Sequence, residues 1–349
     1  MSAIAETMER PAQKTATGTL LEVRDLKVHF PIKRSGDVVK AVDGVSFNVR
    51  QGTTLAVVGE SGSGKTTTAL AVMRLAPVTS GQMRLGEVQL DSLEGEELRQ
   101  IRRRMQFIFQ DPFSSLNPRE RAGATVRAPL DLMNIGSEAE RKQRVDELFT
   151  QVGLRPEQQN LFPHQFSGGQ RQRINIARAL ATKPDLVVCD EPVSALDVAV
   201  RAQVLNLLVK LQREMGLTYL FISHDMAVVE HICDDIAVLY LGQIVEQAPR
   251  RAFFSNPLHP YSVALMSAVP TVHGGRTRAA NRIKLTGDPP SPINPPPGCR
   301  FAGRCPAVEP ACREALPELR EVEPGHWVRC RRIDVVGGVA QPILRMPTV

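Results

Sequence analysis

The chain has 349 residues, 42 % of them hydrophobic, and a formal net charge of +6. This composition is typical of a globular protein and excludes disorder along the whole chain, and no apolar run reaches the ~18 residues that a membrane-spanning helix needs. The basic residues are spread out and densest at 99–106, which favours a solvated or membrane-proximal face over a surface for nucleic acid.

The N-terminal part of the chain predicts a tail, three strands and a helix. Residues 1–19 lack the apolar core of a secretory signal and predict a disordered tail, so we expect a reducing cytosolic environment. Residues 20–30 and 38–49 alternate apolar and polar side chains, as strands do. Residues 53–59 form an apolar run that stops at a glycine, as a buried parallel strand does, and residues 65–76 predict a helix.

The rest of the chain continues this alternation, with a less regular pattern between residues 87 and 165. We predict helices at 94–104, 137–152, 168–182 and 201–216, short apolar strands at 185–192 and 218–225, and a pair of strands at 235–248. Alternating strands and helices predict a parallel α/β fold, whose ligands gather at the carboxyl ends of the strands.

A glycine-rich loop lies between the predicted strand and helix at 53–76. Its sequence GESGSGKT fits the P-loop pattern, in which backbone N–H groups surround phosphate oxygens and the helix N-terminus adds partial positive charge. The lysine can reach the β- and γ-phosphates, and the threonine hydroxyl is placed for Mg²⁺. The residues expected to hold the nucleotide here are Gly59, Glu60, Ser61, Gly62, Ser63, Gly64, Lys65, Thr66 and Thr67.

Two adjacent acids end the apolar strand LVVCDEP. Asp190 is in the place of a carboxylate that holds Mg²⁺, and Glu191 could act as the general base toward an attacking water. A second glycine-rich helix start follows Phe166, at Ser167, Gly168 and Gly169. One nucleotide does not need two anion-binding helix termini in one subunit, so we expect the second to serve the nucleotide of another subunit.

With these motifs together, residues 20–270 resemble the ABC-type ATPases, whose signature motif is SGGQ. The resemblance implies a P-loop NTPase cassette at 20–255 with a RecA-like parallel sheet core, an antiparallel β subdomain and an α-helical subdomain at about 96–180. It also implies ATP and Mg²⁺ as ligands and a nucleotide sandwich dimer, in which the P-loop of one subunit faces Ser167, Gly168, Gly169 and Gln170 of the other.

The resemblance assigns further roles by position. Gln110 matches the glutamine that contacts Mg²⁺ and the attacking water, Asp197 matches the residue at the dimer seam, and His224 matches the histidine near the γ-phosphate. We therefore expect Glu191, His224 and Gln110 to be catalytic, and Thr66, Gln110 and Asp190 to hold Mg²⁺. Phe30 is the candidate for stacking on adenine. All motifs are present, so the expected reaction is in-line attack of water on the γ-phosphate, promoted by charge placement.

The C-terminal segment narrows the family. Residues 256–270 and the cysteine-rich stretch after them resemble the C-terminal extension of oligopeptide and dipeptide importer ATPases, here at 256–332, followed by a tail at 333–349. The resemblance is to the F-type subunit, which pairs with a D-type subunit, although a homodimer is also open. It implies two membrane permeases, a periplasmic or extracellular binding protein, and a peripheral location on the cytoplasmic face of a bacterial inner membrane.

Other classes of ABC-type ATPase fit this sequence less well. Chromosome-type ATPases need a long coiled coil between the P-loop and Asp190, and the intervening residues are too few. Ribosome-type ATPases usually carry two cassettes, and DNA-repair types commonly place zinc modules inside the cassette. A motor for di- and oligopeptide uptake is therefore preferred. Glutathione, nickel chelates and sugars remain alternative solutes, and action on nucleic acid or the ribosome remains the alternative outside transport.

Four of the six cysteines, Cys299, Cys305, Cys312 and Cys330, lie in the C-terminal extension. Their uneven spacing differs from paired zinc-ribbon motifs, and four thiolates suit either an Fe–S cluster or Zn²⁺. The importer resemblance implies a [4Fe–4S] cluster. Residues 288–332 are few and polar, so a metal would supply missing folding energy, with redox sensing as the alternative role. The other two cysteines, Cys189 and Cys233, are predicted to be buried.

Overall fold

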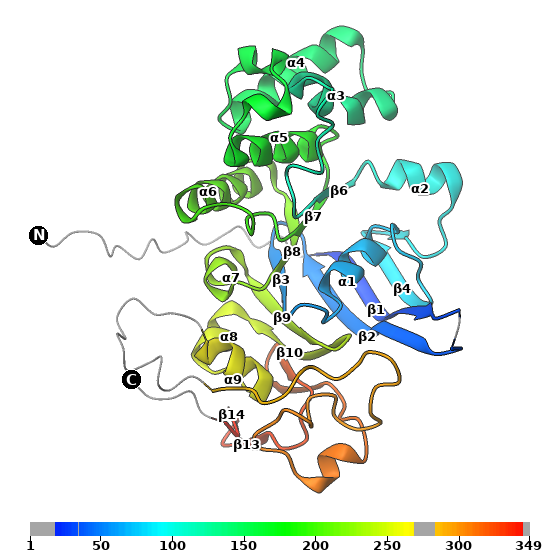
Figure 1. Cartoon of the computed structure of the whole chain (residues 1–349), viewed down its shortest axis with the longest axis vertical. Helices are drawn as coiled ribbons and strands as arrows, with labels where there is room; N and C mark the ends of the chain where they lie inside the picture. Colours follow the sequence, from blue (N-terminus) through cyan, green and yellow to red (C-terminus); the bar gives the residue numbers. More distant parts are fainter. Residues whose placement is uncertain (1–17, 34, 269–282, 345–349) are drawn as a thin grey trace, which may run out of the picture.

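The computed structural model describes residues 18–33, 35–268 and 283–344. The tail predicted at 1–19 therefore lies outside the described residues except for its last two positions. A four-stranded sheet, a helical unit and the C-terminal segment lie around a central eight-stranded sheet (Figure 1).

The central sheet has a parallel core, as the alternation of strands and helices predicts. Its five parallel strands, in the order β9-β3-β8-β7-β6, are β9 (Asp235–Tyr240), β3 (Thr54–Val58), β8 (Thr218–Ser223), β7 (Leu186–Asp190) and β6 (Met105–Ile108). Every residue of β3, β7 and β8 is buried, which is why these strands are continuous apolar runs. The predicted strands at 53–59, 185–192 and 218–225 are confirmed, whereas β6 was not predicted.

The second sheet is antiparallel, in the order β2-β1-β4-β5. Its strands are β1 (Thr19–Pro31), β2 (Val38–Arg50), β4 (Ser80–Leu85) and β5 (Val88–Gln89). Helix α1 (Lys65–Val72) contacts strands of both sheets, and one apolar core joins the three. The first two strands were predicted from their alternation, but β4 buries only Met83 and Leu85 and β5 has two residues, so neither gives that signal.

The helical unit lies apart from the small sheet, at the top of Figure 1. It contains α3 (Ala122–Leu132), α4 (Glu138–Gln151), α5 (Gly168–Leu180) and two short 3₁₀ turns at Pro156–Asn160 and Pro163–Gln165, while α2 (Gly95–Ile101) precedes β6. Helix α4 begins at a capping box in which the Ser137 hydroxyl accepts the N–H of Glu140 and the Glu140 carboxylate accepts the N–H of Ser137.

The remaining helices flank the central sheet. They are α6 (Val198–Met215), α7 (Met226–Ile232), α8 (Arg250–Ser255) and α9 (Pro260–Ser267), and Gly216 ends α6 in the left-handed conformation, with φ of 67°. Cys189 and Cys233 are fully buried, which confirms their assignment to the core. In the described part of the chain, no helix combines the length and apolar character needed to cross a membrane.

The C-terminal extension continues the central sheet. Strand β10 (Gln243–Pro249) pairs with β9 and also with β12 (His326–Val328), and β11 (Arg320–Glu323) adds the edge. A hairpin of β13 (Asp334–Val336) and β14 (Val339–Gln341) follows.

The extension also packs on the cassette core. Phe301 and Val328 have exposed fractions of 1 % and 0 %, and Phe301 joins an apolar cluster with residues of α7, α8 and α9. The sequence was right that residues 288–332 bury little core by themselves, but the cassette supplies the missing apolar surface. Burial against the cassette is therefore a source of folding energy for this segment that requires no metal. The boundary between cassette and extension that the sequence places after residue 255 stays a prediction.

A buried histidine makes stability pH-dependent. His259 caps α9 by accepting the N–H of Tyr261 at Nδ1, at 3.1 Å, and burial lowers its pKa to about 4. In the unfolded chain an imidazole titrates near pH 6.5. As pH falls from 6.5 toward 4, the unfolded state binds a proton that the folded state excludes, so the free energy of unfolding should decrease by up to about 3 kcal/mol.

Replacing His259 by Asn, which can still cap the helix, should remove this part of the pH dependence. Urea unfolding at pH 7.5, 6 and 5 measures it. The exposed His164, which stacks on Phe162, is the control, and His164→Asn should leave the pH dependence unchanged. Equal pH dependence in wild type and His259→Asn would contradict this account.

Candidate nucleotide site

The glycine-rich loop joins β3 to α1 at the carboxyl end of the central sheet. Gly64 precedes α1 with φ of 103°, and a Cβ there would lie 2.3 Å from the carbonyl oxygen of Ala41, so only glycine fits. The Lys65 ammonium donates to the carbonyl oxygens of Gly59 at 2.8 Å and Glu60 at 2.9 Å. These bonds hold the lysine across the loop. A bound phosphate could replace the carbonyl oxygens as the hydrogen-bond acceptor of the ammonium.

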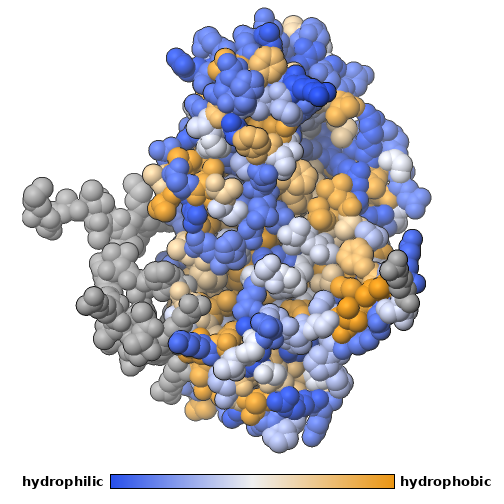
Figure 2. Space-filling view, in the orientation of Figure 1, coloured by the Kyte–Doolittle hydropathy of each residue, from blue (hydrophilic) through white to orange (hydrophobic). Residues whose placement is uncertain are grey.

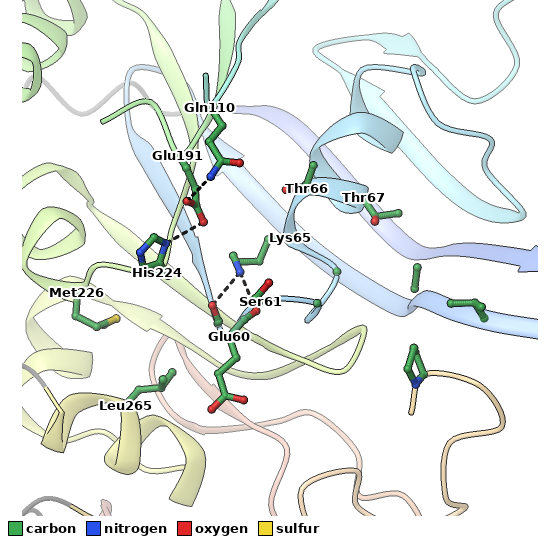
Figure 3. A pocket seen from close by; sticks show the side chains of 16 residues that line it. Glu60, Ser61, Lys65, Thr66, Thr67, Gln110, Glu191, His224, Met226 and Leu265 are labelled. Carbon is green, nitrogen blue, oxygen red and sulfur yellow. Dashed lines mark hydrogen bonds and ion pairs between the residues drawn. The ribbon is translucent and has the colours of Figure 1, made fainter. Parts of the chain in front are cut away.

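A cavity of about 690 Å³ opens over this loop (Figure 3). It is lined by Gly59–Gly62 and Gly64–Thr67, together with Gln110, Glu191 and His224. The Ser63 hydroxyl does not line it and is buried with no hydrogen-bond partner among the described residues. The loop, the lysine and the helix N-terminus therefore fit the triphosphate of ATP.

Glu191 is the centre of the catalytic group. Its Oε1 lies 2.9 Å from Nδ1 of His224, and its Oε2 accepts a hydrogen bond from the Gln110 amide at 3.1 Å. The three residues follow β7, β8 and β6, which are neighbours in the sheet, and they meet in Figure 3. The backbone of Glu191 is held at φ of 46°, a strained value for a non-glycine residue that is common at functional sites. The predicted catalytic residues thus converge on one carboxylate.

Two of the three predicted magnesium ligands, Thr66 and Asp190, contact each other. The Thr66 hydroxyl donates to Oδ1 of Asp190 at 3.2 Å, and burial raises the pKa of Asp190 while the Lys65 ammonium opposes that change. Hydroxyl and carboxylate oxygens are ligands that Mg²⁺ prefers, so these two residues fit the ion. Gln110 instead contacts Glu191, next to this pair. Mg²⁺ bound here would neutralise charge on the phosphates.

The second glycine-rich motif lies outside the cavity. Ser167 caps α5: its hydroxyl accepts the N–H of Gln170, and the Gln170 side chain accepts the N–H of Ser167. Ser167 and Gly168 are exposed. Asp197 likewise caps α6, accepting the N–H of Val200 at 3.0 Å, and does not line the cavity. The prediction that these residues serve a second subunit therefore stays open.

The two glycines of this motif should differ in their tolerance of a side chain. A Cβ at Gly169 would lie 2.3 Å from Cγ1 of Val200, whereas one at Gly168 would lie 3.6 Å from Leu196. We expect Gly169→Ala to lower the free energy of unfolding by about 1–3 kcal/mol, because α5 must move from α6. Chemical denaturation measures this change.

Gly168→Ala is the matched control and should change stability by less than about 1 kcal/mol. Adding Val200→Ala to Gly169→Ala should recover most of the loss, because it removes the colliding methyl group. Equal losses for the two glycine variants would contradict the steric explanation.

The cavity has walls that the sequence did not reveal. Val39 and Ala41 of β2, Met226, Leu265 of α9 and Pro292 of the extension line it. Met226 follows His224 closely, but Leu265 and Pro292 belong to the extension, which carries none of the nucleotide-binding motifs. Phe30 does not line the cavity; it is 37 % exposed and pairs with Val39 across the sheet. Its role in adenine stacking remains a prediction.

The four cysteines of the extension lie near one another without forming a metal site. The N–H of Cys299 donates to the carbonyl oxygen of Cys312 at 2.8 Å. Burial raises the pKa of Cys330 to about 11, and the three other thiols add to that rise. All four are unpaired thiols, and the described residues contain no group of three or more His, Cys, Asp or Glu placed to hold a metal ion. The predicted metal centre is therefore not supported by this arrangement.

Two family models match the chain. Residues 42–194 match the ABC transporter model, and residues 245–312 match the model of the oligopeptide/dipeptide transporter C-terminal region. The matches cover the P-loop, Glu191 and the first part of the extension.

Curated relatives are similar over most of their length. The chain is 48 % identical over 319 residues to the oligopeptide transport ATP-binding protein AppF of Bacillus subtilis, covering 89 % of this chain and 97 % of that protein. It is 49 % identical over 316 residues to a putative peptide import ATP-binding protein of Brucella ovis, covering 90 % and 98 %.

Solved structures share the cassette fold. One is the ATP-binding cassette MJ0796 in a dimeric, post-hydrolysis state bound to ADP and Pi, with a TM-score of 0.60 and 30 % identity over 66 % of this chain and 99 % of that one. Another is cbiO1 of Clostridium perfringens, described as part of the ABC transporter complex cbiONQ, with a TM-score of 0.61 and 26 % identity over 68 % and 91 %.

Proposed function

The chain belongs to the ABC transporter ATPases of the peptide-transport type, and we propose that it hydrolyses ATP to drive uptake of di- and oligopeptides across a bacterial inner membrane. The single observation that carries the hydrolytic part is the Glu191 carboxylate held between Gln110 and His224 beside the P-loop. The peptide part is supported by relatives whose names describe peptide transport.

The residues divide the reaction among them. The P-loop N–H groups and Lys65 bind the phosphates, and Thr66 and Asp190 are the residues that would hold Mg²⁺. Glu191 accepts the proton of the attacking water, while Gln110 and His224 orient its carboxylate.

A dimer completes the site in this proposal. Ser167, Gly168 and Gly169 are the N-terminal end of α5, outside the cavity of their own chain, and would face the nucleotide of the second subunit. A similar cassette is described as dimeric with ADP and Pi bound, which supports this arrangement. A D-type partner is proposed, and a homodimer is the alternative.

The permease would dock in a groove of about 550 Å³ between β6, α3 and the end of α1. Leu75 and Phe109 line the groove and are 50 % and 42 % exposed, and Phe109 precedes the catalytic Gln110. Figure 2 shows apolar side chains exposed in patches below the largely hydrophilic helical unit. Of the two permeases, one would dock on each ATPase subunit at the cytoplasmic face. An apolar segment of that permease in the groove would contact Phe109, the residue before Gln110.

Uptake assays test the cargo. A strain lacking this gene should lose uptake of labelled di-, tri- and oligopeptides, and the wild-type gene should restore it, but Glu191→Gln should not. Loss of glutathione, nickel-chelate or sugar uptake with unchanged peptide uptake would contradict peptide transport. Loss of none of these, with an effect on nucleic acid or ribosome function, would contradict transport altogether.

A metal centre at Cys299, Cys305, Cys312 and Cys330, either a [4Fe–4S] cluster or Zn²⁺, stays a proposal. It is supported by the mutual proximity of the thiols, although they would have to move to become ligands. Anaerobic purification followed by a visible spectrum and assays of iron, sulfide and zinc tests it. Colourless protein with stoichiometric zinc would contradict the cluster, and protein free of all three would contradict any metal.

A further inference from the structure

We propose that two side chains of the C-terminal segment, Tyr261 and Arg304, position the P-loop through Glu60 and thereby set the affinity for ATP. We call this pair the P-loop clamp. The proposal rests on the proposed function in one respect, that the cavity over the P-loop binds ATP. It assigns to the extension a role in nucleotide binding, in addition to whatever the cysteines do.

Tyr261 holds one peptide group of the P-loop. Its hydroxyl accepts the N–H of Glu60 at 2.8 Å, and the carbonyl oxygen of the same peptide group, that of Gly59, accepts from the Lys65 ammonium at 2.8 Å. A peptide group is planar, so rotating this one breaks both bonds. Tyr261 is fully buried and packs against the rings of Tyr240 and Phe301, with centroids 4.7 and 5.5 Å away. The packed aromatic rings therefore fix the position of the Gly59–Glu60 peptide group, and through it the position of the Lys65 ammonium.

Arg304 holds the side chain of the same residue. Its Nη1 and Nη2 lie 2.7 and 3.2 Å from the two carboxylate oxygens of Glu60, a bidentate pair, and the arginine side chain is only 9 % exposed. Figure 3 shows the Glu60 carboxylate directed away from the Lys65 ammonium. The pair thus turns a negative charge of the P-loop away from the place where an anionic triphosphate binds.

Without Arg304, the carboxylate of Glu60 would be an unpaired charge beside the phosphates. Glu60 lines the cavity and its side chain is 30 % exposed, so a carboxylate released from Arg304 and turned toward the cavity would repel the phosphates. The freed carboxylate would also compete with the phosphates for the Lys65 ammonium, which already donates to the carbonyl oxygen of Glu60 at 2.9 Å. Both effects weaken ATP binding and neither alters the groups around the attacking water.

The clamp is anchored by the segment between two cysteines. Residues 299–305 begin and end with cysteine, and Arg300, between them, donates to the carbonyl oxygen of Leu241 at 2.5 Å and forms an ion pair with Asp43. The same short segment therefore contacts two elements that line the nucleotide cavity, β2 through Arg300 and the P-loop through Arg304. A change in the conformation of residues 299–305 would therefore change the affinity for ATP.

Nucleotide affinity of the purified full chain tests the clamp. With a fluorescent ATP analogue, we expect the Kd for Arg304→Gln and for Tyr261→Phe to rise about tenfold, the effect of losing one charge-assisted or buried hydrogen bond. ATPase assays should show KM raised by a similar factor, with kcat at saturating ATP within about twofold of wild type, because the catalytic group is untouched.

A second variant separates positioning from general damage to the fold. Adding Glu60→Gln to Arg304→Gln removes the unpaired charge, so the double variant should bind ATP more tightly than Arg304→Gln alone. A purely structural role for Arg304 predicts no such recovery. Arg332→Gln is the control, because Arg332 contacts Glu309 and the Ala307 carbonyl within the extension, and it should leave Kd unchanged.

The outcomes distinguish the two levels of the proposal. Wild-type protein that does not bind the analogue would overturn nucleotide binding itself. Wild-type protein that binds it, with unchanged Kd in Arg304→Gln and Tyr261→Phe, would overturn only the clamp, as would equal weakening by Arg332→Gln. If Arg304→Gln does not fold, the comparison of Tyr261→Phe with wild type decides the question.

Discussion

Replacing Glu191 by Gln is expected to lower ATP turnover by about 10²–10⁴-fold while ATP binding persists. Glutamine has the same shape and can still accept a hydrogen bond from His224 or Gln110, the partners of the carboxylate at 2.9 and 3.1 Å. Its amide cannot take a proton from water. The loss therefore falls on kcat, and the P-loop contacts of Lys65 remain intact.

Three measurements check this result. Turnover is followed by phosphate release, binding by a fluorescent ATP analogue, and association by size-exclusion chromatography with ATP, where Glu191→Gln should accumulate as a stable ATP-bound dimer. Glu214→Gln, at an exposed residue paired only with Lys210, is the matched control and should retain turnover. Unchanged hydrolysis in Glu191→Gln would contradict the general-base assignment, and simultaneous loss of binding would place Glu191 among the binding residues instead.

The convergence of the catalytic residues could be predicted because it depends on topology. Glu191 and His224 each follow a predicted strand of the parallel core, and neighbouring parallel strands bring their carboxyl ends to one edge. Gln110 follows β6, which was not predicted, so its place in the site came from the family resemblance alone. The P-loop is contiguous in sequence, so its function is readable without any knowledge of the fold. The P-loop is a local motif and the strands are periodic patterns, so both can be recognised in the sequence without tertiary information.

The contribution of the extension to the site could not be predicted. Strands β11 and β12 have four and three residues, too few for a periodic pattern, and they form only because β10 offers an edge. Tyr261 and Arg304 reach the P-loop, and Pro292 reaches the cavity wall, through packing between segments far apart in the chain. Phe30 pairs with Val39 across β1 and β2, and Val39 lines the cavity while Phe30 does not.

Replacing Glu246 by Ala should lower the free energy of unfolding by about 3–5 kcal/mol. Glu246 is a fully buried carboxylate in β10. Its Oε1 accepts the N–H of Leu258 at 2.9 Å and contacts Nε2 of His326 at 2.8 Å, and its Oε2 accepts the N–H of His259 at 2.7 Å. Alanine would leave three buried polar groups without their partner and loosen the segment before α9 and strand β12 together.

Urea unfolding measures the loss, and hydrogen exchange of the amides in β12 and α9 should locate it. Glu321→Ala is the control, because Glu321 is exposed and accepts only the N–H of Gly325, so its removal should cost less than about 1 kcal/mol. Glu246→Gln should lie between the two, since the amide oxygen can serve two donors while its NH₂ group faces a third. If Glu246→Ala is no less stable than Glu321→Ala, the buried carboxylate does not hold the extension to the sheet, and the apolar contacts of Phe301 and Val328 must do so alone.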